Sequence, residues 1–91
     1  MTYLDDAQAL AVVKESITRI APDADFASVR PDDRLRDVFD LDSLDFLSLV
    51  EVLSERTGIR IDEADFPDLA TLAGATRFLV DRSRTGAGRR P

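Results

Sequence analysis

Residues 35–61 read LRDVFDLDSLDFLSLVEVLSERTGIRI, and this stretch decides the expected fold. Asp42 is a good helix N-cap, because its carboxylate can accept hydrogen bonds from the free N–H groups of the first turn. Asp45, three residues later, imitates a capping box. Gly58 is a typical C-cap. A helix is therefore predicted over about residues 43–57, with a serine as its first residue.

The predicted helix has two unlike faces. One face carries apolar residues at i, i+3, i+4 and i+7, which predicts a stripe that packs into the core. This stripe consists of Phe46, Leu49, Val50 and Leu53. Leu44 and Leu47 begin a second face, and Glu51 and Glu55 continue it one and two turns later. Because the second face is apolar at its top and acidic below, we expect it to stay exposed.

Apolar residues at helical spacing predict two more main helices. The first covers residues 5–21, and its inward residues are Leu10, Val13, Ile17 and Ile20. Thr71 caps the last helix. The inward residues of that helix are Leu72, Ala75, Phe78 and Leu79.

The connections between these helices differ in length. Residues 22–41 show no sustained period, so we expect a long loop that single apolar side chains attach to the core. These side chains are Phe26, Val29, Leu35, Val38 and Phe39. Ile59 and Ile61 alternate with arginine but have no partner strand, so we expect them to tether the chain to the core. Residues 62–66 predict one short helical turn that stops at Pro67. The expected fold is all-α, a four-helix bundle with three main helices, a short third helix and a long loop between helices 1 and 2.

Composition excludes several classes of function. The 91 residues include no cysteine and no histidine. The chain therefore lacks thiolate metal ligands and the commonest general base, and we expect no catalytic residue and no metal site. A calcium loop counted from Asp40 fails, because Leu44 and Asp45 stand where a ligand and a glycine are needed. No apolar run approaches the roughly 20 residues of a membrane span, so we expect a cytoplasmic protein without membrane partners.

Charge divides the chain near residue 81. Residues 1–81 contain all 18 acids and eight of the 12 bases, a balance of −10. Such a body repels nucleic acid and favours partners that present lysine and arginine. Residues 82–91 contain four arginines, no acid and no apolar anchor. We expect one folded domain over residues 1–81 and a disordered tail over residues 82–91.

The serine at the start of the central helix, Ser43, has two interpretations. It is an ordinary polar residue in a first helical turn, or it is a site of modification. Backbone N–H groups and the helix dipole favour negative charge at this position, so they would stabilise a phosphoester. A hydrolase serine is excluded, because the chain has neither GxSxG nor a histidine. The hydroxyl suits a phosphate-linked adduct.

The stretch from residue 35 to residue 61 resembles the acyl carrier protein family, whose signature is Asp-Ser-Leu at the start of the second helix. The resemblance covers about residues 5–81, including the long loop, the short helix around DEADF and the closing helix LATLAGATRFLV. It implies that Ser43 is the attachment point for 4'-phosphopantetheine, which a phosphopantetheinyl transferase transfers from coenzyme A. Acyl thioesters on its thiol would then move between enzymes of fatty-acid, polyketide or related specialised biosynthesis. The chain would be a carrier and not an enzyme.

The resemblance also implies a docking surface around the serine. The candidate docking residues are Asp42, Leu44, Asp45, Leu47, Glu51 and Glu55. Residues 37–55 contain six acids and no base. The expected partners are the transferase and acyl-loading and acyl-processing enzymes with basic docking surfaces, and the expected state is a monomer. An ordinary solvated helix face is the alternative.

Four positions depart from the family pattern, and two other functions stay open. The family has an acid where this chain has Ser48, and Arg56 and Arg60 interrupt the acidic run seen in fatty-acid carriers. The family often has glycine where this chain has Asp40, so the loop before the helix is expected to differ from the usual tight turn. An aminoacyl or peptidyl carrier, loaded by an adenylating enzyme, is the nearest alternative, although DSLD argues mildly against it. An unmodified helical interaction module, with its arginine-rich end touching nucleic acid or a membrane, belongs to another class.

Overall fold

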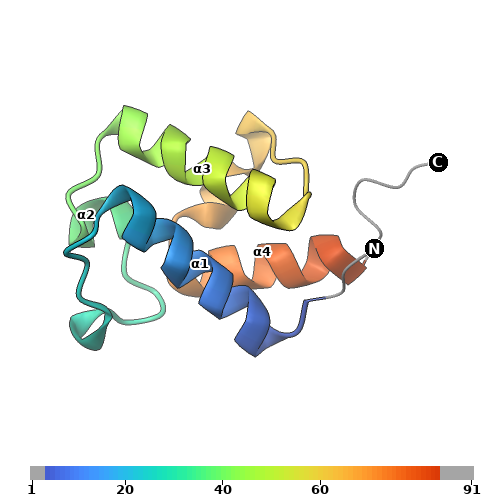
Figure 1. Cartoon of the computed structure of the whole chain (residues 1–91), viewed down its shortest axis with the longest axis horizontal. Coiled ribbons are helices and arrows are strands. Elements are labelled where there is room, and N and C mark those ends of the chain that lie inside the picture. Colours follow the sequence, from blue (N-terminus) through green and yellow to red (C-terminus); the bar gives the residue numbers. More distant parts are fainter. Residues whose placement is uncertain (1–3, 85–91) are drawn as a thin grey trace.

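The computed structural model describes residues 4–84, which form a helical bundle (Figure 1). The elements are α1 Asp6–Ile20, η1 Phe26–Ser28, α2 Leu35–Val38, α3 Ser43–Thr57, η2 Glu63–Leu69 and α4 Leu72–Arg84. The η elements are 3₁₀ helices. α1 packs against both α3 and α4, and η2 packs against α4. The predicted all-α bundle, with three main helices and a short third one, is confirmed.

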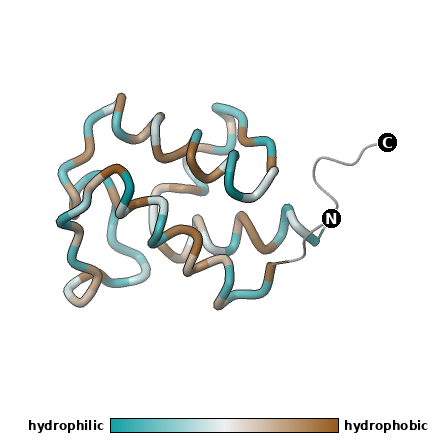
Figure 2. The backbone as a smooth tube through the Cα atoms, in the orientation of Figure 1, coloured by the Kyte–Doolittle hydropathy of each residue, from teal (hydrophilic) through white to brown (hydrophobic). Residues whose placement is uncertain are grey.

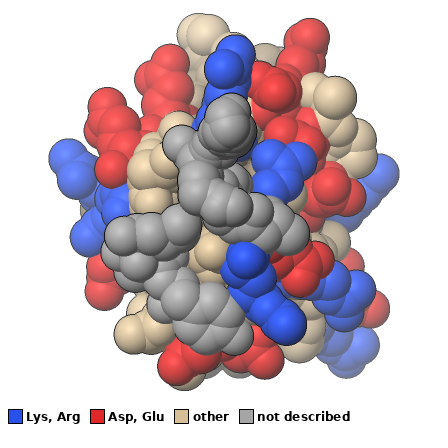
Figure 3. Space-filling model, turned by 90° about the vertical axis from the view of Figure 1, so that its right-hand side faces the viewer, with Lys and Arg blue, Asp and Glu red and all other residues tan. Residues whose placement is uncertain are grey.

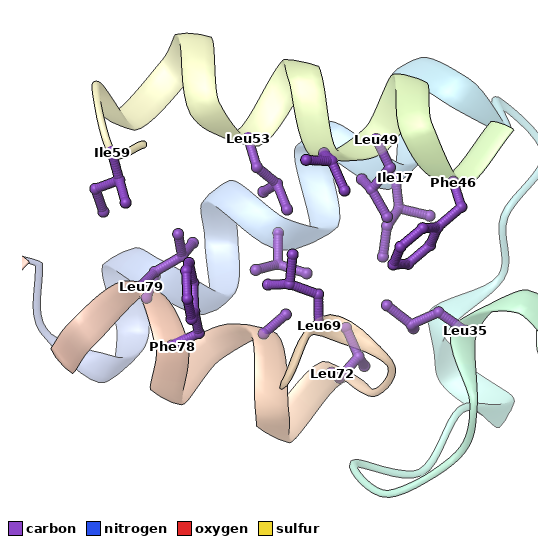
Figure 4. Close-up of a cluster of buried hydrophobic side chains, with 14 of the residues drawn as sticks. Ile17, Leu35, Phe46, Leu49, Leu53, Ile59, Leu69, Leu72, Phe78 and Leu79 are labelled. Carbon is purple, nitrogen blue, oxygen red and sulfur yellow. The ribbon is translucent and has the colours of Figure 1, made fainter. Parts of the chain in front are cut away.

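The core lies between α3 and α4, with α1 behind them (Figure 4). The predicted stripes of α3 and α4 are confirmed, because every residue of both sets is buried. Leu49 and Leu53 of α3 point toward the interior, as do Phe78 and Leu79 of α4 (Figure 4). Hydrophobic and hydrophilic residues alternate along all three long helices, as expected when each helix buries only one side (Figure 2).

The buried face of α1 differs from the predicted one. Its buried residues are Ala9, Val13, Ser16 and Ile17. Leu10 and Ile20 pack against the core but are only partly buried, so the predicted stripe is confirmed only in part at these two positions. Small side chains at Ala9 and Ser16 let α1 approach its neighbours closely, and the Ser16 hydroxyl donates a hydrogen bond of 2.7 Å to the Val12 carbonyl within α1.

The long connection after α1 contains two short helices, so the prediction of a loop without regular structure is wrong for η1 and α2. The prediction that single apolar side chains attach it to the core is confirmed for Phe26, Val29, Leu35 and Phe39, and it is wrong for Val38, which is exposed. Leu35 is fully buried, and the rings of Phe26 and Phe39 pack edge to face at 5.3 Å. The Leu35 N–H also donates to the Ala70 carbonyl at 2.8 Å, which holds α2 beside the start of α4.

The segment between α3 and α4 runs further than predicted. Ile59 is buried, which confirms the expected tether. Pro67 lies inside η2, so the prediction that the helical turn stops there is wrong. A proline removes only its own N–H donor from a helix. The helical hydrogen bonding continues after Pro67, because the Ala70 N–H donates to the Pro67 carbonyl at 3.4 Å, a 3₁₀ hydrogen bond.

α4 continues three residues into the predicted tail, so the expectation of disorder from residue 82 is wrong for residues 82–84. Arg82 binds the Asp65 carboxylate at 2.7 Å and lies over the Phe78 ring at 4.5 Å. Ser83 is buried, and its hydroxyl accepts a hydrogen bond of 3.0 Å from the Leu4 N–H. The remainder of the predicted tail, residues 85–91, lies outside the described residues.

None of the helices between residues 4 and 84 combines the length and apolar content that a bilayer crossing requires. Acidic and basic side chains are intermixed on the end of the bundle that Figure 3 presents. The segment 37–55 contains acids alone. Within this segment, which covers the start and most of α3, the charge is of one sign.

Candidate functional site

Ser43 is the first residue of α3, and its side chain is exposed. The neighbouring aspartates form the predicted capping box. The Asp42 carboxylate accepts a hydrogen bond from the Asp45 N–H at 2.8 Å, and the Asp45 carboxylate accepts one from the Asp42 N–H at 3.3 Å. The helix start is therefore capped without the Ser43 hydroxyl, which leaves that hydroxyl available for chemistry.

The cap can be tested by mutating Asp42. Asp42→Ala is expected to lower the free energy of unfolding by about 1 kcal/mol, because the first turn of α3 loses an acceptor. Asp42→Asn keeps a side-chain oxygen at the same place and is expected to retain most of that stability. Urea denaturation of both variants measures the difference. Equal losses in the two variants would show that the charge of Asp42, and not its hydrogen bond, stabilises α3.

The turn that precedes Ser43 is built by Asp40 and Leu41. Asp40 has a φ of 55°, in the left-handed region that glycine adopts most easily. Asp40 therefore adopts a backbone conformation that glycine favours. The expectation that the loop before α3 differs from the usual tight turn is not met at the φ angle of Asp40. Leu41 is buried, and its N–H donates to the Arg36 carbonyl at 2.9 Å. This closes the loop between α2 and α3.

Arg36 of α2 contacts Ser43, and this contact was not predicted from the sequence. Its Nη2 donates a hydrogen bond to the Ser43 Oγ at 3.4 Å, and its Nε donates to the Leu41 carbonyl at 3.4 Å. Both bonds are long. They nevertheless place a permanent cation beside the exposed hydroxyl. A phosphoester formed on that oxygen would meet this cation and the N-terminus of α3, so the residues present fit such a group.

Large apolar side chains are exposed on both sides of Ser43 in the sequence. The large hydrophobic residues that are exposed between residues 4 and 84 are Val38 at 40%, Leu44 at 73% and Leu47 at 43%. Leu44 and Leu47 belong to the predicted docking set. Val38 was expected to attach the loop to the core, but its side chain is exposed. Exposed apolar side chains near one another are typical of surfaces that bind partners.

The acids of α3 form no ion pair with any residue between 4 and 84. Glu51 and Glu55 are exposed, and the ion pairs formed within residues 4–84 involve other acids. Arg56, which interrupts the acidic run in sequence, binds Glu15 of α1 at 2.9 Å and so belongs to the interface between α1 and α3. The exposed side of α3 therefore keeps an unbalanced negative charge. The docking role of the six candidate residues remains a prediction.

A pocket of about 550 Å³ opens beside this site. Leu41, Phe46 and Phe66 line its apolar part, whereas Arg36 and Asp40 are among its polar lining residues. The rings of Phe46 and Phe66 meet edge to face at 5.5 Å, which joins the start of α3 to η2. In the part of the chain from residue 4 to residue 84, no group of three or more acidic side chains could hold a metal ion.

These features define a class of small helical protein that displays one exposed hydroxyl at a helix start rather than enclosing an active site. Residues 7–79 match the family described as "Phosphopantetheine attachment site", so the chain belongs to this family. The family carries a covalently attached 4'-phosphopantetheine group, which confirms the cofactor expected from the resemblance. Its members are generally non-catalytic carriers that interact with phosphopantetheinyl transferases and biosynthetic enzymes.

Proposed function

We propose that Ser43 carries the 4'-phosphopantetheine group and that the protein is an acyl carrier protein. Its cargo is an acyl group held as a thioester on the terminal thiol. The carrier moves this cargo between enzymes of fatty-acid, polyketide or related specialised biosynthesis. The observation that supports this proposal most strongly is the exposed Ser43 hydroxyl, which lies within the family match, is not used for capping and is bordered by exposed apolar side chains.

The attachment step needs nothing from the chain except the hydroxyl and its surroundings. The Ser43 oxygen forms a bond to the phosphorus that bears the pantetheine in coenzyme A. The bond between that phosphorus and the bridging oxygen of the diphosphate breaks, and adenosine 3',5'-bisphosphate leaves. In this proposal the hydroxyl proton passes to a base of the transferase.

A direct experiment on the unmodified protein tests the attachment. Incubation with coenzyme A and a transferase of broad specificity is expected to add the mass of one phosphopantetheine to the intact chain. An unchanged mass, with a transferase that modifies another carrier in the same tube, would contradict the proposal.

The nature of the cargo needs a second experiment. The modified protein is incubated separately with enzymes that load acyl groups and with adenylating enzymes that load amino acids. An acyl carrier is expected to gain mass only with the acyl-loading enzymes. Exclusive loading with an amino acid would assign the protein to the aminoacyl or peptidyl carriers instead.

The acidic side of α3 is proposed to dock basic partner surfaces. Glu51→Lys is expected to lower kcat/KM of the transferase about tenfold, because it replaces an attraction by a repulsion across the interface. The effect is expected to shrink at high salt. Asp23→Lys changes an exposed acid in the turn after α1 and the net charge equally, so it serves as a control that retains activity. Equal losses in both variants would point to net charge rather than to docking by α3.

A further inference from the structure

Arg36 contacts Leu41 through both its backbone and its side chain. The Arg36 carbonyl accepts a hydrogen bond of 2.9 Å from the Leu41 N–H, while the Arg36 Nε donates to the Leu41 carbonyl at 3.4 Å. Backbone and side chain of Arg36 thus bind the same residue, one before the cap of α3. The guanidinium is therefore positioned by the loop, although its side chain is exposed, and its Nη2 is directed at the Ser43 Oγ.

Among the residues from 4 to 84, Arg36 forms an ion pair with no carboxylate. The ion pairs found within residues 4–84 are made by Arg56, Arg60 and Arg82. Arg36 stays outside these pairs, although residues 37–55 contain six acids. A guanidinium that is oriented toward a hydroxyl, and not toward the surrounding acids, is available for an anion placed on that hydroxyl.

Arg36 also lies at the boundary between Ser43 and the pocket beside it. It lines the pocket together with Leu41, Phe46 and Phe66 and contacts Ser43 at the same time. Leu44, which follows Ser43 in α3, is exposed and does not line this pocket. A group bound by Arg36 is thereby placed at the mouth of the pocket.

We infer that Arg36 is a positioning residue for the arm. Its guanidinium pairs with the phosphodiester on Ser43 and directs the attached pantetheine over the pocket of Leu41, Phe46 and Phe66, away from the exposed Leu44. The two pantoyl methyl groups of the arm then contact the apolar lining. Leu44 and Leu47 stay uncovered for partners. This inference rests on the proposed attachment to Ser43.

NMR of the modified protein tests the inference. In the unmutated protein, nuclear Overhauser contacts are expected between the pantoyl methyl groups and the Phe66 ring, and the Arg36 Nε–H resonance is expected to shift on attachment. Arg36→Ala is expected to weaken the methyl contacts about threefold, the size of effect that an exposed ion pair allows. Arg36→Lys keeps the charge and is expected to restore part of them.

A matched control is Arg30→Ala. Arg30 is exposed on the same connection, and only its backbone, not its side chain, forms a hydrogen bond within residues 4–84. This variant is expected to keep the methyl contacts. Amide spectra of the unmodified Arg36→Ala protein show whether the loop at Leu41 keeps its conformation. If the loop is disturbed, the Arg36 Nε–H shift in the unmutated protein decides.

The outcomes separate the inference from the function on which it rests. An intact chain that gains no mass with coenzyme A and an active transferase overturns both. A chain that gains the mass normally, but whose arm lacks the methyl contacts or whose Arg36 resonance does not shift, overturns the positioning role alone. Methyl contacts that persist unchanged in Arg36→Ala, with the loop intact, do the same.

Discussion

Ser43→Ala is expected to abolish the incorporation of phosphopantetheine. The oxygen that would bond to phosphorus is absent from alanine, so the transferase has no acceptor at the start of α3. Stability is expected to change by less than about 0.5 kcal/mol, because the side chain is exposed and the capping box does not use it. Intact mass spectrometry after incubation with coenzyme A and transferase measures the incorporation.

Ser48→Ala is the matched control for this variant. Ser48 is also an exposed serine of α3, one and a half turns after Ser43. Its replacement by alanine is expected to leave the mass gain unchanged. If Ser43→Ala still gained the full mass, another residue would carry the group. The assignment of Ser43 would then be wrong, although the family would remain the same.

Leu35→Ala is expected to destabilise the protein by about 3 kcal/mol. Leu35 is fully buried, and α2 is only four residues long, so this side chain supplies most of the apolar contact between α2 and the core. Because Arg36 follows directly, the contact with Ser43 is expected to loosen as well. Urea denaturation gives the loss of stability, which is a large fraction of the 5–15 kcal/mol that a typical domain has.

Leu44→Ala provides the contrast. Leu44 is 73% exposed, so this variant is expected to change stability by less than about 0.5 kcal/mol. Its effect should instead be on the reaction with partners.

If Leu35→Ala unfolded at the same urea concentration as the unmutated chain, the prediction for Leu35 would be wrong. The long connection would then be held by something other than Leu35.

The features predicted correctly from the sequence are those that depend on near neighbours. Asp42 and Gly58 mark the ends of α3 because caps act within one helical turn. The buried stripe beginning at Phe46 follows from helical spacing alone. The exposure of the face that includes Leu44 was also predicted correctly. A helix face that begins with apolar residues and continues with acids is poorly suited to burial.

The features that were missed depend on residues distant in sequence or on exact turn geometry. The burial of Ala9 and Ser16 depends on how closely α1 approaches two other helices. The contact from Arg36 to Ser43 depends on the left-handed turn at Asp40, which no periodicity reveals. A cation placed shortly before an acidic stretch was the available signal. Pro67 stays inside η2 because a 3₁₀ helix tolerates the loss of one donor.

The measurement that tests the central proposal most directly is tandem mass spectrometry of the unmutated chain after modification. The protein is digested, and the peptide that carries the added mass is fragmented to locate it. The expected result is a single phosphopantetheine on Ser43, in the peptide that contains DLDSLDF. Phosphopantetheine on any other residue, or no modified peptide from a chain exposed to an active transferase, would contradict the proposal.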